Sequence, residues 1–153
     1  MNKKRFDCDV VVMSGAELDT DICVTGNVYM EKGSNANGYD IDAGESFKAY
    51  HAEFFNVSAG ENIVLTHSIG NDVKAGNGVF LNGPCVLGDI FSNGDVSISS
   101  NSSVWDVSAN GTIEVLANAH AKNVTSSKMV LKEVKSEVEH IKSKEVEFYL
   151  YVG

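Results

Sequence analysis

The chain has 153 residues, enough for one domain with a buried core, and its formal net charge is −9. The charge is uneven, because residues 7–121 carry 16 acidic side chains and three lysines, whereas residues 1–6 carry three basic side chains and no acid. An acidic surface repels phosphate backbones, which argues against nucleic acid as a partner.

The chain shows no apolar leader and no apolar run of transmembrane length. Its three cysteines, Cys8, Cys23 and Cys85, are odd in number and unevenly spaced, which indicates free thiols in a reducing compartment. We therefore expect a cytoplasmic protein. Lys3, Lys4, Arg5 and Phe6 are the candidates for a contact with the inner membrane surface, and a solvated N-terminus is the alternative.

In chain order, residues 1–8 read as a short basic segment and residues 9–153 as one β-solenoid domain. Residues 9–14 predict a first strand or a cap, and residues 24–28 predict a turn of the solenoid. Residues 30–38, rich in Gly, Asn and Ser, predict a loop.

From residue 40 onward a repeat of 16 to 17 residues dominates the chain. Each repeat contains a small residue, and an aliphatic residue stands two positions before it. The small residues are Ala43, Ala59, Ala75, Ser92, Ala109, Ser126 and Ser143, and the aliphatic residues are Ile41, Val57, Val73, Ile90, Val107, Val124 and Ile141. This period is too short for helical repeats and fits one coil of a single-stranded parallel β-helix, with about seven to eight coils in all.

Two more apolar columns follow the small residue in each repeat and are themselves two positions apart, as on one face of a strand. They are Phe47, Ile63, Val79, Val96, Ile113, Met129 and Val146, and then Ala49, Leu65, Leu81, Ile98, Val115, Leu131 and Phe148. A less regular apolar column near the end of each coil completes three sets, which predicts a roughly triangular cross-section.

Polar corner residues accompany each coil. An Asp or Asn precedes most of the aliphatic positions, and we expect these side chains to bind backbone amides of the neighbouring coil; a calcium ladder is the alternative. Gly44, Gly60 and Gly76 follow the small column, where glycine would permit the positive φ of a sharp corner.

The C-terminal region allows two interpretations. Residues 128–144 match the repeat, but their near-heptad apolar spacing also fits a terminal helix; the repeat is the preferred interpretation. The chain then closes on an aromatic and aliphatic strand with no polar cap, which predicts self-association. Its candidate residues are Phe148, Tyr149, Leu150, Tyr151 and Val152, with Phe148, Leu150 and Val152 inward and the tyrosines outward.

Chemistry-bearing motifs are sparse. His51 and His67 are 16 residues apart and should stack on adjacent coils, which makes them weak candidates for a metal site that lacks a third ligand unless His120 or a partner supplies it. Trp105 and Phe91 are candidate outward aromatic residues. No pattern predicts a catalytic residue or a cofactor, so we expect a non-enzyme.

The phrase Gly83-Pro-Cys-Val-Leu-Gly-Asp-Ile-Phe-Ser-Asn-Gly-Asp-Val-Ser-Ile98 resembles the bactofilins, the polymer-forming bacterial cytoskeletal family, and residues 24–28 and 106–115 are similar. The resemblance implies a right-handed triangular β-helix that assembles end to end into nucleotide-free filaments. A structural protein that binds itself is therefore the leading hypothesis. A carbohydrate-binding or adhesive β-helix module and a left-handed β-helix acyltransferase are the alternatives.

Overall fold

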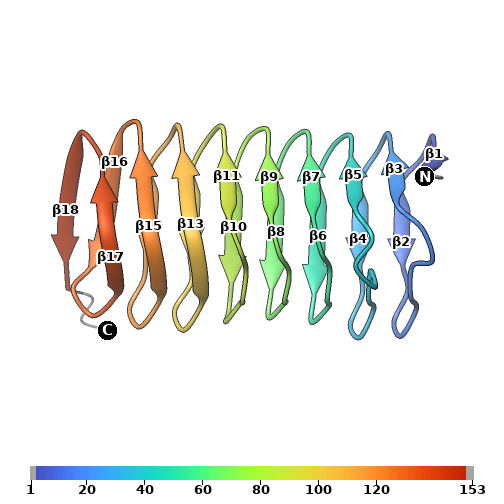
Figure 1. Cartoon of the computed structure of the whole chain (residues 1–153), viewed down its shortest axis with the longest axis horizontal. Helices are drawn as coiled ribbons and strands as arrows, with labels where there is room; N and C mark the ends of the chain where they lie inside the picture. The colour runs from blue at the N-terminus through green and yellow to red at the C-terminus, as the bar shows by residue number, and fades with distance from the viewer. Residues whose placement is uncertain (1–2, 151–153) are drawn as a thin grey trace.

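The computed structural model describes residues 3–150, and within them the chain forms a parallel β-solenoid of about nine turns with no helix (Figure 1). Each turn contributes one strand to each of two nine-stranded parallel sheets. The first sheet contains β1 (Lys4–Phe6), β3 (Ile22–Val24), β5 (Ile41–Ala43), β7 (Val57–Ala59), β9 (Val73–Ala75), β11 (Ile90–Ser92), β13 (Ser103–Ala109), β15 (His120–Ser126) and β17 (Glu137–Lys142). The second contains β2 (Val10–Val12), β4 (Val28–Met30), β6 (Phe47–Tyr50), β8 (Ile63–Thr66), β10 (Val79–Asn82), β12 (Val96–Ile98), β14 (Ile113–Val115), β16 (Met129–Glu133) and β18 (Glu145–Tyr149).

A third side of the solenoid is formed by single β-bridges rather than by strands. These bridges link, in order, Glu17, Asn35, Glu53, Ile69, Val86 and Ser103. From Ser103 onward this side merges with the first sheet, because β13, β15 and β17 each run through both sides without interruption. The predicted three-sided coil is therefore confirmed, and its last three turns have the longest strands of the first sheet.

The predicted columns form the core. Ile41 pairs with Val57, which pairs with Val73, and the small residues Ala43 and Ala59 stack beside them. These side chains are all buried, and the column that begins at Phe47 is buried as far as Ile113. In a solenoid, one inward position in the repeat thus generates a continuous column of buried apolar side chains, which is the main stabilising term.

The second column shifts by one residue in its eighth turn. The sequence analysis placed Met129 and Leu131 inward, but Ile113 pairs with Val130 and Val115 pairs with Lys132. Val130 is fully buried, whereas Met129 is only half-buried. The β-branched Val130 keeps the six-residue step from Val124 that Val107 and Ile113 also have.

Two segment predictions meet the structure directly. Residues 128–144 form β16 and β17, so they belong to the solenoid and the terminal-helix interpretation is wrong. Residues 30–38 are wrong as a free loop, because Ser34 and Ala36 are buried and Asn35 bridges to Glu17 and Glu53. These early turns span 18 and 19 residues, from Lys4 to Ile22 and from Ile22 to Ile41, which hides them from a period of 16 or 17.

The corner glycines are needed for space and not for φ. A Cβ on Gly60 would stand 2.2 Å from the carbonyl oxygen of Gly44, and one on Gly76 would stand 2.2 Å from that of Gly60. None of these three glycines has a positive φ. The expectation of a positive φ is therefore wrong here, and the close approach of successive backbones explains the glycines.

Candidate functional sites: the two ends, the polar ladders and the side of the rod

The C-terminal end of the solenoid exposes its own core. β18 continues the inward columns, because Val146 pairs with Val130 and Phe148 pairs with Lys132. No further turn covers these side chains within the described residues, so Val146 is only half-buried and Phe148 is 63% exposed. Leu150 is also exposed, whereas Tyr151 and Val152 lie outside the described residues.

Tyr149 differs from its predicted outward orientation. Its ring is half-buried and lines a cavity of about 170 Å³. The other lining residues are Ser100, Leu116, Ala117 and the buried Glu133. Burial raises the pKa of the Tyr149 phenol, and the nearby carboxylates of Glu114 and Glu133 raise it further.

The N-terminal end is a second partly exposed part of the core. Phe6, Val10, Ala16 and Leu18 pack against the core but remain partly exposed, around a shallow cavity of about 280 Å³. Val11 and Met13 beside them are exposed. The strand β1 falls inside the segment 1–8 and pairs in parallel with β3, so it is the outermost strand of the first sheet.

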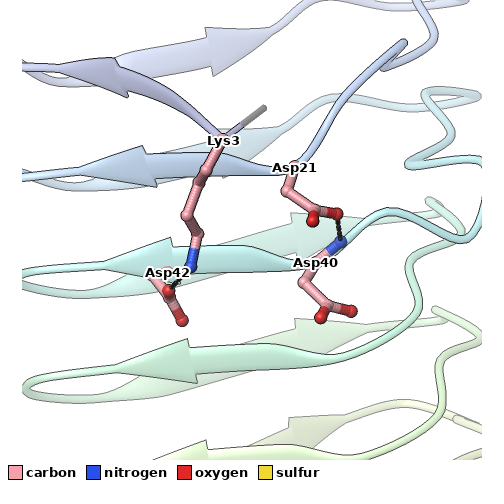
Figure 2. Close-up of polar contacts among 4 residues, drawn as sticks. All are labelled: Lys3, Asp21, Asp40 and Asp42. Atoms are coloured by element: carbon pink, nitrogen blue, oxygen red, sulfur yellow. Dashed lines mark hydrogen bonds and ion pairs between the residues drawn. The ribbon is translucent and has the colours of Figure 1, made fainter. Parts of the chain in front are cut away.

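The candidate membrane residues are placed by this first turn. Figure 2 shows that the Lys3 ammonium group reaches across β3 to the carboxylate of Asp42 on β5. This hydrogen bond raises the pKa of Lys3. The Arg5 Nε group lies 3.1 Å from Asp7, and the Lys4 Nζ atom lies 5.7 Å from the centre of the Phe6 ring. Two of the three basic side chains therefore have acidic partners within the chain.

The Asx column is a hydrogen-bonded ladder. Asp21 accepts a hydrogen bond from the Asp40 backbone N–H at 2.8 Å (Figure 2). Asp72 and Asp89 do the same for the next turn, at 3.0 and 3.2 Å. The predicted role of these side chains, which is to bind amides of the neighbouring coil, is confirmed.

The ladder forms no recognisable ion site. Across residues 3–150, no three His, Cys, Asp or Glu side chains converge so that they could hold a metal ion. The same residues contain no helix long and apolar enough to cross a membrane. The three cysteines are free thiols, as expected, and Cys85 is buried.

The histidine pair stacks as predicted. The rings of His51 and His67 are parallel within 11°, with centroids 4.7 Å apart. A Cβ on Gly83, the next residue of the column, would stand 2.6 Å from the Nε2 atom of His67, so this ring covers a glycine. The proposed third ligand, His120, instead pairs with Glu137 at 3.2 Å. The structure therefore explains the pair by stacking and brings no third ligand to it.

One cleft on the side of the rod was not predicted. It lies over β13, β15 and β17 and is lined by Ser103, Val104, Trp105, His120, Ala121, Lys122, Lys132, Ser136, Glu137, Val138 and Glu139. The sequence signal for it was Trp105, which is exposed as expected, as is Phe91. The partners of Trp105 come from the next two turns, so only the register brings them together.

Comparisons with protein-family models, with curated proteins and with solved structures found no match.

Proposed function

We propose that this chain is a non-enzymatic structural protein that self-assembles through its terminal turns, as a bactofilin-like cytoskeletal polymer or scaffold. The observation that carries the proposal is that the core columns run to both ends of the rod and are only partly covered there. A parallel strand at the edge of a sheet presents unpaired backbone groups, and natural solenoids usually cap such ends. Here apolar side chains stand beside the strand edges instead.

The columns of the two ends are compatible with one another. If a second copy continued the ladder, its Val10 would follow Val146 and its Val12 would follow Phe148. The large Phe6 would follow the small Ser143, as Phe6 now precedes Val24. Such a heterologous contact does not close on itself and therefore generates a filament.

The charges at the N-terminal end bear on the choice of partner. Lys3 and Arg5 already pair with Asp42 and Asp7, so binding to an anionic membrane would have to compete with these pairs. We therefore propose that the primary partner of this cytoplasmic protein is a second copy of the chain and that the inner membrane surface is secondary. The proposed role involves no cofactor and no nucleic acid.

The test is the size distribution of purified protein in which Phe148 is replaced by Arg. We expect the wild-type chain to form filaments or oligomers visible by negative-stain electron microscopy. The Phe148→Arg variant should instead sediment as a smaller species with unchanged β-rich circular dichroism, because a charge in the end face opposes its burial. Phe55→Arg is the matched control, because Phe55 is an exposed aromatic residue on the side of the rod.

A wild-type chain that stays monomeric at tens of micromolar would contradict the proposal. Equal loss of assembly in Phe148→Arg and Phe55→Arg would also contradict it, because the contact would then not be at the end.

A further inference from the structure

The cleft over the last turns of the first sheet has a volume of about 650 Å³ and lies on the side of the rod, away from the columns of the core. It exists because β13 bends in its middle. Trp105 and Asp106 are consecutive residues of this strand and are both exposed, which breaks the usual in-out alternation. The bend points the indole of Trp105 outward, with 59% of the residue exposed.

Hydrogen-bonding side chains surround this indole. His120 Nδ1 lies 3.2 Å from a carboxylate oxygen of Glu137, and the two residues are direct neighbours on β15 and β17. Ser103 precedes His120 in the same column, and Lys122 and Glu139 lie two residues further along these strands. The cleft therefore combines one large aromatic surface with a hydroxyl, an imidazole, an ammonium and two carboxylates.

The charge of this lining indicates the ligand class. Lys122 and His120 are balanced by Glu137 and Glu139, so the cleft has no excess charge to attract a polyanion or a polycation. An exposed aromatic ring beside donors and acceptors fits a ligand that has both an apolar ring face and many hydroxyl groups. Sugars have this combination of groups.

We propose that the cleft beside Trp105 binds a neutral saccharide, with one sugar ring against the indole and hydroxyl groups hydrogen-bonded to Ser103, His120 and Glu137. The ammonium group of Lys122 lies 5.0 Å from the centre of the indole in the free protein. Such a cation–π contact between exposed groups is weak, so Lys122 can move aside and donate to a hydroxyl group of the ligand. This inference is independent of the proposed end-to-end assembly.

The experiment uses the full chain and the fluorescence of Trp105, which is its only tryptophan. The probes are cellohexaose, maltohexaose and chitohexaose. At least one should change the emission in a saturable way, and calorimetry should show about tenfold weaker binding to Trp105→Ala, because the stacking surface is lost. Glu137→Gln should weaken binding several-fold without changing the thermal unfolding temperature.

The matched control is Phe91→Ala. Phe91 is an exposed aromatic residue with a lysine, Lys74, whose Nζ atom lies 5.6 Å from the ring, but it is outside the cleft. It should bind the saccharide as the wild type does. Phe148→Arg should also bind it normally, which separates this inference from the assembly proposal.

Three outcomes would overturn the inference. The first is that none of the three probes changes the emission and a glycan array shows no signal that depends on Trp105. The second is that Trp105→Ala and Phe91→Ala weaken saccharide binding equally. The third is that Trp105→Ala changes the oligomeric state without affecting any saccharide, which would assign the cleft to a protein contact.

Discussion

The middle turns and the last turn of this solenoid carry the same apolar columns in different surroundings. Val107, in the seventh turn, is buried, whereas Val146 and Phe148, which continue inward columns in β18, are half-buried and exposed. The difference comes from the neighbouring turns, since a middle turn is covered on both sides and the last turn on one. In a solenoid, burial is thus a property of position along the rod as well as of position within the repeat.

The largest expected effect comes from a charge in the middle of the column. Val107→Asp should destabilise the protein by more than about 3 kcal/mol, because the carboxylate is buried without a partner. Val146→Asp should cost much less, because this side chain already touches solvent. Thermal unfolding of both variants checks this, and a Val107→Asp melting temperature within a degree or two of the wild type would refute the core assignment.

A smaller effect should follow from a methyl group at a corner of a middle turn. Gly60→Ala places a Cβ against the carbonyl oxygen of Gly44, so the two turns must move apart, at a cost of about 1–3 kcal/mol. Gly38→Ala is the control, because Gly38 has a positive φ of 79° but no atom within 4 Å of the new Cβ. It should cost about 1–2 kcal/mol for the backbone conformation alone.

Chemical denaturation of both glycine variants separates the two explanations of a conserved-looking corner pattern within this chain. If Gly60→Ala were as stable as the wild type, the close approach of Gly44 and Gly60 would not constrain the corner. A similar cost at both sites would leave the comparison between spacing and φ undecided, so the position of the Gly60→Ala backbone should be determined by crystallography as well.

The smallest effect concerns pH at the last turn. Because the pKa of the Tyr149 phenol is raised above its ordinary value of 10.0, the folded state favours the protonated form. This contribution to stability is present below the pKa of the unfolded state and is lost as the pH rises through the pKa of the folded state. The free energy of unfolding should therefore fall in that alkaline range, and Tyr149→Phe should remove part of the fall. An identical pH dependence in both proteins would contradict the role of this phenol.

The middle of the rod was the part of the fold that the sequence predicted best. Ile41, Val57 and Val73 recur at one period, and each turn of a solenoid repeats the environment of the turn before it. The Asx ladder was predictable for the same reason, because Asp72 and Asp89 meet the same backbone amide one turn apart. The stacked histidines followed from their spacing of one repeat.

The candidate sites were less predictable. The exposed Trp105 was expected, but the bend in β13 that orients it and the pair His120–Glu137 beside it depend on the register of three turns. At the C-terminal end the sequence identified Phe148, but it placed Tyr149 outward although the ring packs into a cavity beside Glu133. A two-residue alternation does not indicate where the last turn folds back on the turn before it.

The sequence by itself determined the repeat, the residues that face inward in the regular turns and the absence of a helix in their neighbourhood, because one period sets both the strand pairing and the burial. Only the tertiary structure decided the two long early turns, the inward position of Val130 and the reason for the glycine at residue 60. Those features depend on distances between successive backbones. Such distances leave no trace in a pattern of apolar residues, so they became visible only when the turns were stacked.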